Sequence, residues 1–335
     1  VYKRQRLDMV FPPALVFPPA LAGTVYIVGA GPGDIGLLTL KGAHYLSQAD
    51  VVFHDDLLDR HLLDLCARQC HVNRLETIKG ALCRTGERAV VYSHGAHFGE
   101  ERPLVGRFGS GTIFFSRCNL NCLFCQNWEI SQKDEGRAVS SEELAAMMLH
   151  LQELGCHNIN CVSPSHVVAQ ILAALALAAE QGLRIPLVYN TGGYDSLEAL
   201  SLLDGVVDIY MPDMKFADSA VAQKYTHVRN YPEVNQTAVK EMHRQVNELV
   251  LDEHGIAQRG LLIRHLVLPE NSAGTDQILA FIAREISPNT YLNLMDQYRP
   301  CYRASEFQPL DRRLSRSEFQ MAKVQAKKHG LRRLD

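Results

Sequence analysis

The sequence predicts an α/β protein with a (β/α)6 partial TIM barrel and a small N-terminal strand-loop-helix appendage. From residue 111 onward, six apolar runs alternate with segments of helical periodicity. The apolar runs lack regular polar alternation, which indicates strands buried on both faces of a parallel sheet. Polar residues follow the ends of these runs, and that edge of such barrels carries the active residues.

Each element can be placed in order along the chain. The expected strands are 111–116, 158–163, 185–191, 206–212, 261–269 and 290–298. The expected helices are 140–155, 166–181, 196–203, several within 218–250, 275–286 and 315–329. Ser140 and Glu143 have the spacing of a capping box, and Leu144, Met147 and Leu151 share one helical face.

The part before the barrel divides into three stretches. Residues 1–23 contain the tandem repeat VFPPAL-VFPPAL, which predicts a proline-rich, disordered tail. Residues 24–65 are expected to form a strand, a glycine-rich turn, a helix and a second strand in DVVFHDDLL. Residues 66–110 form a cysteine-containing segment of low periodicity, and residues 111–335 form the barrel core.

Composition limits the function. The chain has 335 residues and a net charge of −3 without a basic stripe, which argues against a nucleic-acid partner. No apolar run approaches about 18 residues, so no membrane span is expected. Prolines at positions 12, 13, 18 and 19 interrupt the apolar N-terminal stretch, which argues against a signal peptide. We therefore expect a cytoplasmic protein whose nine cysteines are free thiols or metal ligands.

The polar residues at the expected strand ends form one set. They are Ser165, His166, Asn190, Thr191, Asp213, Lys215 and Arg264. Each also has a simpler interpretation, such as a turn for Asn190 or a solvated pair for Asp213 with Lys215. Their convergence at one edge favours a site, and a charge within an apolar strand, as at Arg264, requires a partner or a ligand.

Three cysteines in FFSRCNLNCLFCQNWEIS follow the first expected barrel strand. Cys118, Cys122 and Cys125 have spacings of four and three, without a fourth ligand nearby. A structural zinc site normally has four ligands, whereas three thiolates can hold a [4Fe–4S] cluster and leave one iron for a substrate or cofactor. Phe124 is expected to shield such a cluster from water. Zinc and non-binding thiols are the alternatives.

The motif CNLNCLFC in this context resembles the radical S-adenosylmethionine (SAM) enzymes. More narrowly, residues 66–335 resemble the uncharacterised relatives of pyruvate formate-lyase activating enzyme, through stretches such as HFGEERPLVGRFGSG, VYNTGGYDS, VVDIYMPDMKF and YLNLMDQYRP. The resemblance implies that a reduced cluster cleaves SAM to a 5′-deoxyadenosyl radical, which takes hydrogen from a partner. It also implies a protein or peptide substrate in trans and a flavodoxin or ferredoxin as electron donor.

The resemblance also suggests roles for the strand-end residues. Lys215 and Arg264 would hold the carboxylate end of SAM. Asn190, Thr191, Met211 and Asp213 fall where activating enzymes hold a monovalent cation beside SAM, with Asn190 in place of the usual Asp. Ser165 and His166 stand where the glycine-rich stretch that meets the SAM amino group is usual.

Two features of the front part resemble known sequences. Cys66, Cys70 and Cys83 are similar to an upstream cysteine group in this branch, but Leu63 stands where a further cysteine is usual. They form either an auxiliary metal or cluster site or a structural remnant. Residues 24–65, with the motif GAGPGD, resemble an N-terminal fragment of uroporphyrinogen-III C-methyltransferase.

Three functions are therefore weighed. A radical SAM enzyme similar to the activating enzymes of glycyl-radical enzymes is favoured. The alternatives are a SAM-dependent methyltransferase carried by residues 24–65 and a non-catalytic iron–sulfur or zinc module. Deletion of residues 1–60 would separate the first two, and metal analysis would identify the third.

Overall fold

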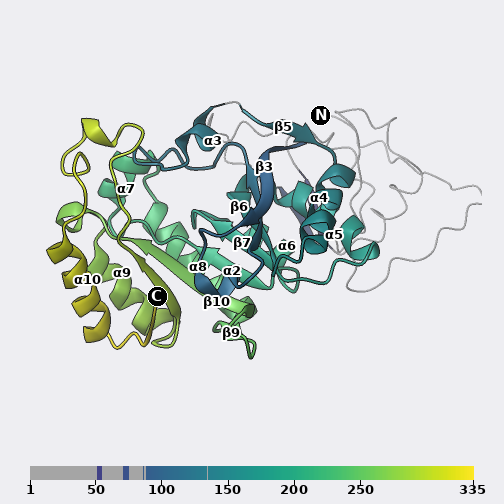
Figure 1. The fold of residues 1–335 in the computed structure, drawn as a ribbon. Coiled ribbons are helices and arrows are strands. Elements are labelled where there is room, and N and C mark those ends of the chain that lie inside the picture. Colours follow the sequence, from purple (N-terminus) through teal and green to yellow (C-terminus); the bar gives the residue numbers. More distant parts are fainter. Residues whose placement is uncertain (1–50, 55–70, 75–85, 87, 134) are drawn as a thin grey trace, which may run out of the picture. The chain divides into compact units, whose positions relative to one another are not determined.

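The structure is a computed structural model that describes residues 51–54, 71–74, 86, 88–133 and 135–335. It divides into two compact units, Val1–Lys79 and Gly80–Asp335 (Figure 1). In the first unit, β1 (Val51–His54) pairs in parallel with β2 (His71–Arg74). β1 lies within the second strand expected for residues 24–65. The other predictions for residues 1–65 fall outside the described residues.

The second unit contains the predicted run of six parallel strands. They are β4 (Ser110–Phe115), β6 (Ile159–Val162), β7 (Leu187–Thr191), β8 (Ile209–Pro212), β10 (Ala257–Leu266) and β11 (Tyr291–Met295). They are hydrogen-bonded in that order. The mostly parallel sheet confirms the (β/α)6 partial-barrel prediction, and it places the carboxyl ends of the strands along one edge.

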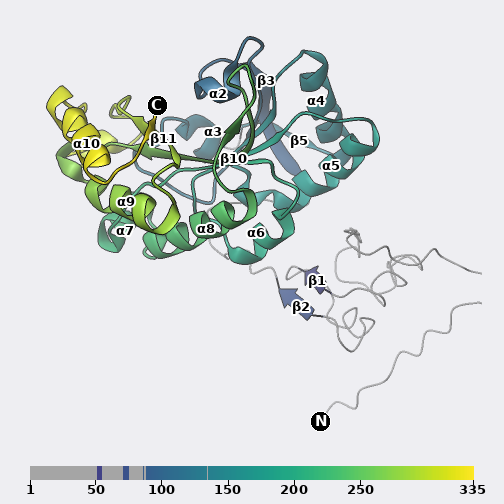
Figure 2. The same cartoon turned by 90° about the horizontal axis from the view of Figure 1, so that it is seen from below.

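Helices alternate with these strands, as predicted. They are α4 (Ser141–Glu153), α5 (Val168–Glu180), α6 (Leu197–Leu203), α7 (Ser219–Thr226), α8 (Tyr231–Val246), α9 (Thr275–Phe281) and α10 (Arg316–Lys328). Figure 2 shows α5 to α10 ranged in an arc along one face of the sheet. The predicted capping box of α4 is present, because Ser140 Oγ accepts from Glu143 N and the Glu143 side chain accepts from Ser140 N.

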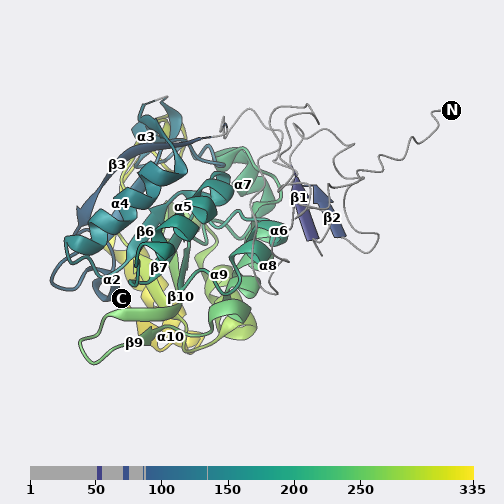
Figure 3. The same ribbon diagram turned by 90° about the vertical axis from the view of Figure 1, so that its right-hand side faces the viewer.

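Four described strands of the second unit, and β2 of the first, were not predicted. β3 (Ala89–His97), which is labelled in Figure 3, pairs antiparallel with β4 on one side and with β5 (Arg137–Val139) on the other. Two short strands, β9 (Val250–Leu251) and β12 (Arg333–Leu334), pair with β10 and β11. In β3 only Ala89 and Val91 are buried, so the strand lacks the apolar run that marks the parallel strands.

Shorter helical segments complete the described fold, and they include 3₁₀ helices at Pro164–His166, Pro269–Asn271 and Ala304–Glu306. α2 (Arg102–Val105) and α3 (Trp128–Gln132) flank β4 in the chain, and α9 continues as a π-helix over Ile282–Ile286. The main apolar core fills the space between the sheet and the helices, and fully buried Leu144, Met148 and Leu151 contribute to it from α4. No described helix combines the length and apolarity needed to cross a membrane.

Candidate active site at the strand ends

The three predicted thiols lie on the loop that follows β4. Cys122 is buried, and Cys118 and Cys125 are partly buried. The Leu120 N–H donates to Cys118 Sγ at 3.4 Å, and Cys125 Sγ lies 3.4 Å from Ser131 Oγ. Burial raises the pKa of Cys118 to about 11 and raises that of Cys122 further. In the free protein Cys118 and Cys122 are therefore protonated, and these two thiols would release protons on binding metal.

An apolar shell surrounds this loop. Phe124 is 5% exposed and makes an edge-to-face contact with Phe216, with ring centroids 5.7 Å apart. Leu120, Cys122 and Leu123 belong to the same buried cluster, and Cys118 and Cys125 pack against it. Such a shell limits the access of water to a bound redox group.

The donor set of the loop is compatible with a cluster. Among the described residues, no three Cys, His, Asp or Glu side chains are gathered closely enough to hold one metal ion. A single zinc ion requires every ligand within about 2.3 Å of one point. A [4Fe–4S] cluster has no such requirement, because each thiolate binds a different iron.

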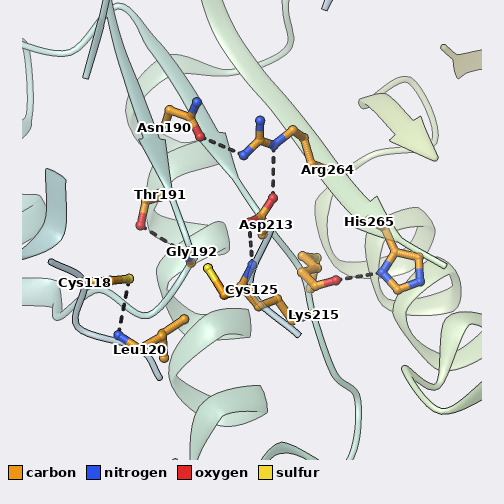
Figure 4. Close-up of polar contacts among 12 residues, drawn as sticks. Cys118, Leu120, Cys125, Asn190, Thr191, Gly192, Asp213, Lys215, Arg264 and His265 are labelled. Atoms are coloured by element: carbon orange, nitrogen blue, oxygen red, sulfur yellow. Dashed lines mark hydrogen bonds and ion pairs between the residues drawn. The ribbon is translucent and has the colours of Figure 1, made fainter. Parts of the chain in front are cut away.

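Beside the thiols lies a cluster of three charged side chains (Figure 4). Asp213, after β8, accepts from Lys215 Nζ at 2.6 Å and from Arg264 Nε at 3.0 Å. These side chains are only 16%, 20% and 18% exposed. Burial alone would raise the pKa of Asp213, but the two cations hold it below its usual range. The carboxylate is therefore ionised and joins the ends of β8 and β10.

The residues predicted to surround a monovalent cation are already committed to other partners. Asn190 Oδ1 accepts from Arg264 Nη2 at 2.8 Å, and Asp213 Oδ1 accepts from the same guanidinium. Thr191 Oγ1 donates to Asp195 Oδ2 at 2.6 Å. Met211 is fully buried. Arg264 thus contacts side-chain oxygens of Asn190 and Asp213, two of the four residues predicted to lie at the cation site.

Ser165 and His166 form a different part of the same edge. Ser165 Oγ lies 2.9 Å from Thr191 Oγ1, and His166 Nε2 lies 2.9 Å from the carbonyl oxygen of Ser116. Burial lowers the pKa of His166, so the ring is neutral near pH 7. These contacts join the ends of β4, β6 and β7.

Tyr231 and Asn235 of α8 support the site and were not predicted. Tyr231 Oη lies 2.8 Å from the Gly192 carbonyl oxygen and 3.1 Å from that of Asp213. Asn235 Nδ2 donates to the carbonyl oxygens of Gly193 and Asp213, both at 2.9 Å. Gly193 has φ of 76°, and a Cβ there would approach Asn235 Nδ2 and the Asp213 oxygen to 2.2 Å. The close approach of α8 therefore requires glycine.

Burial of His265, the residue after Arg264, predicts that the free energy of unfolding falls at acid pH. Its Nδ1 lies 2.7 Å from the Met214 carbonyl oxygen and its Nε2 lies 3.0 Å from Thr275 Oγ1. Burial lowers its pKa to about 4 from an ordinary value of 6.5. Below pH 6.5 the unfolded chain binds a proton at His265, whereas the folded chain binds this proton only below about pH 4. The contribution of His265 to the free energy of unfolding is therefore fully present above pH 6.5. It falls between pH 6.5 and 4, by up to about 3 kcal/mol.

Urea denaturation across pH 4 to 7 measures this effect. His265→Gln should show a shallower fall in unfolding free energy over that range than the wild type. His254→Gln changes a histidine whose side chain is 77% exposed and should retain the wild-type slope. Equal slopes for all three proteins would contradict the assignment.

Cys66, Cys70 and Cys83 lie outside the described residues. The auxiliary site remains a prediction from the sequence.

A partial (β/α)6 barrel with three closely spaced thiols after its first parallel strand is typical of the radical SAM class. Residues 112–256 match the family described as the Radical SAM superfamily. Uncharacterized protein MJ0674 of Methanocaldococcus jannaschii is 35% identical over 276 residues, which cover 79% of this chain and 74% of that protein. The chain belongs to the radical SAM superfamily, which implies a [4Fe–4S] cluster and SAM.

The N-terminal part has different relatives. Residues 24–102 match the family described as Tetrapyrrole (Corrin/Porphyrin) Methylases. Siroheme synthase of a Psychrobacter species is 56% identical over 50 residues, which cover 15% of this chain and 10% of that enzyme. The chain therefore spans about a tenth of such relatives.

Among solved structures, the fold is similar to SuiB of Streptococcus suis bound to S-adenosylmethionine. The TM-score is 0.42 and the identity 13%, over 64% of this chain and 45% of that chain. A second SuiB structure, bound to the precursor peptide SuiA, is similar to this chain with a TM-score of 0.42 and 12% identity. The similarity covers 63% of this chain and 45% of that chain.

Proposed function

We propose that the protein is a radical SAM enzyme that activates a partner protein or peptide by hydrogen abstraction, similar to the activating enzymes of glycyl-radical enzymes. The observation that carries the proposal is the three-thiol loop beside a buried charge cluster at the strand ends. Cys118, Cys122 and Cys125 would each hold one iron and leave the fourth for SAM. When bound, the cluster supplies the electron that cleaves SAM to methionine and a 5′-deoxyadenosyl radical.

The charge cluster favours binding of the SAM carboxylate. Lys215 and Arg264 share the carboxylate of Asp213, and Arg264 also lies 3.5 Å from Glu100. Lys215 is the better placed of the two cations. Its ammonium group has three donors, one of which is used by Asp213, and it acts electrostatically on both Cys118 and Cys122.

The remaining residues position these groups and exclude water. Tyr231 and Asn235 fix the backbone at Asp213, and Phe124 with Phe216 covers the thiol loop. The carboxylate and its two cations therefore keep their geometry with little reorganisation when SAM binds. The partner in trans and a flavodoxin or ferredoxin as electron donor are carried over from the resemblance.

Tetrapyrrole methylation is the second candidate, and the match of residues 24–102 favours it. Part of that matched stretch is β3, which pairs with β4 of the barrel sheet. The radical SAM proposal rests on the larger described unit.

One experiment tests the main proposal. The full chain is reconstituted without oxygen with iron and sulfide, mixed with SAM and dithionite, and assayed for 5′-deoxyadenosine. Formation of 5′-deoxyadenosine that requires both the metal and the reductant is expected. An intact cluster that yields none would overturn the proposal, whereas methyl transfer to a tetrapyrrole would favour the second candidate.

We expect SAM cleavage to be independent of monovalent metal cations. Arg264 occupies Asn190 Oδ1 and Asp213 Oδ1, so a fixed guanidinium replaces a free cation. Exchanging Na⁺ and K⁺ for tetramethylammonium should leave the rate of 5′-deoxyadenosine formation unchanged. In Arg264→Gln the rate should fall and be partly restored by Na⁺ or K⁺. A wild-type enzyme that loses activity in tetramethylammonium would contradict this prediction.

A further inference from the structure

A buried serine lies beside the third thiol of the loop. Ser131 belongs to the short helix α3 and is only 7% exposed. Its Oγ lies 3.4 Å from Cys125 Sγ, and this pair is hydrogen-bonded. The helix holds the serine in place, since the Ser131 N–H donates to the carbonyl oxygen of Asn127 at 2.9 Å. Either atom of the oxygen–sulfur pair could be the donor, so the neighbouring groups must decide the direction of the hydrogen bond.

The side-chain amide of Gln132 decides this direction. Gln132 Nε2 lies 3.5 Å from the carbonyl oxygen of Leu120, which can only accept, so the amide turns its nitrogen to this side. The same Nε2 lies 3.3 Å from Ser131 Oγ and donates to it. The hydroxyl oxygen of Ser131 therefore accepts from Gln132, and its own hydrogen is directed to Cys125 Sγ.

Deprotonation of Cys125 makes Ser131 the necessary donor. A cysteine gives up its proton when it binds a metal, and a thiolate sulfur can only accept. The hydroxyl of Ser131 then donates to a negatively charged acceptor in a buried position. Hydrogen bonds of this kind are stronger than those between two neutral groups, and the low local dielectric strengthens them further.

The other two sulfur atoms are influenced by different groups. The backbone N–H of Leu120 donates to Cys118 Sγ at 3.4 Å, and Lys215 acts electrostatically on Cys122. A backbone donor cannot be removed by a side-chain substitution, and removal of Lys215 disturbs the charge cluster around Asp213. Ser131, in contrast, supplies a neutral donor that the loss of a single oxygen atom removes.

A hydrogen bond to a ligand sulfur changes how readily a cluster is reduced. On reduction an iron–sulfur cluster takes up one electron, so the negative charge shared by its irons and sulfurs increases by one. A donated hydrogen bond stabilises the more negative, reduced state more than the oxidised state. It therefore raises the reduction potential.

We propose that Ser131 raises the reduction potential of the cluster by donating a hydrogen bond to Cys125 Sγ. It is a positioning residue that acts through Cys125. The electron comes from the low-potential donor, which is dithionite in the assay, and the proton of Ser131 stays on its Oγ. The proposal rests on the proposed radical SAM function, and it adds that α3 helps to set which electron donors can reduce the cluster.

Potentiometric titration of the reconstituted full chain, without SAM, tests the proposal. The EPR signal of the reduced cluster, recorded at a series of poised potentials, gives the midpoint. In Ser131→Ala the reduction equilibrium should be about tenfold less favourable than in the wild type, as expected for loss of a hydrogen bond to a charged group. That change corresponds to a midpoint lower by about 59 mV for one electron.

Ser110→Ala is the matched control. Ser110 is fully buried, and its Oγ donates to Asn158 Oδ1 at 2.6 Å. It begins β4, whereas the thiol loop follows the other end of that strand. This variant loses a buried serine hydroxyl with its hydrogen bond and should keep the wild-type midpoint. A lower midpoint in Ser110→Ala equal to that of Ser131→Ala would overturn the proposal.

Ser131→Thr and Ser131→Val separate the hydroxyl group from the shape of the side chain. Thr and Val have nearly the same size, but only Thr carries a hydroxyl. The Thr variant should have a midpoint close to the wild type, and the Val variant should have the lower midpoint of Ser131→Ala. This pair also answers the question if Ser131→Ala does not fold. Equal midpoints for the Thr and Val variants, or a wild-type midpoint in Ser131→Ala, would overturn the proposal.

Two further measurements keep this inference separate from the proposed function. A folded Ser131→Ala protein that binds less iron than the wild type would show that Ser131 acts in cluster assembly, and would overturn the tuning role. Formation of 5′-deoxyadenosine by the wild type is scored on its own. Its presence together with an unchanged midpoint in Ser131→Ala refutes only this inference. An intact cluster with the expected shift in midpoint but without 5′-deoxyadenosine refutes only the proposed function.

Discussion

Replacing Cys122 by Ala is expected to abolish 5′-deoxyadenosine formation by the reconstituted protein. Cys122 is the most buried of the three thiols, at 8% exposed, and it lies within the apolar cluster that contains Phe124. No other described thiol is on this loop besides Cys118 and Cys125, and two thiolates would hold the cluster poorly. We expect activity at least about 100-fold below the wild type, since even changes around metal ligands cost 10- to 100-fold.

The matched control is Cys161→Ala. Cys161 lies in β6 and is 1% exposed, so this change removes the same atom from an equally buried position. It should lower stability modestly while iron content, sulfide content and SAM cleavage stay at wild-type levels. Iron content and the visible absorption of the cluster distinguish loss of binding from loss of fold. Full iron and full activity in Cys122→Ala would show that Cys122 is not a ligand.

The alternation of strands and helices could be predicted because it depends on local patterns. The buried strands are apolar runs, and Ser140 with Glu143 marks the start of α4 within four residues of sequence. β3 could not be found in this way. It has one mostly exposed face and includes Ser93, His94 and Gly95, so its stability comes from pairing with β4 and β5, which are distant in the sequence.

The site could be predicted as a set of residues but not as a set of contacts. The rule that parallel strands end at one edge brought Asp213, Lys215 and Arg264 together. It could not show that Asp213 bonds both cations or that Arg264 takes the oxygen of Asn190, because those choices depend on side-chain directions. Tyr231 and Asn235 carried no local signal, since the approach of α8 to the strand ends is decided by tertiary packing.

Replacing Asp213 by Ala is expected to give the largest loss of stability. The change leaves Lys215 and Arg264 mostly buried without their shared anion, and breaking a buried ion pair on one side costs about 3–5 kcal/mol. Because the side chains are 16–20% exposed, the lower end of that range applies, about 3 kcal/mol. SAM cleavage should also be lost, since the two cations would no longer be held in place. Urea denaturation and the 5′-deoxyadenosine assay measure the two effects.

Two further variants show whether this loss comes from uncompensated charge. Asp204→Ala removes one partner of Arg244 on the surface, where the two side chains are 43% and 58% exposed, and leaves the pair of Arg244 with Glu241, so it should cost about 1 kcal/mol or less. Asp213→Ala combined with Lys215→Met removes one of the stranded cations, so the double variant should be more stable than Asp213→Ala alone. The contrary result is a loss in the double variant that equals the sum of the losses in Asp213→Ala and Lys215→Met measured separately. That result would mean that Asp213 stabilises the barrel through packing, and that its charge does not organise Lys215 and Arg264 for an incoming carboxylate.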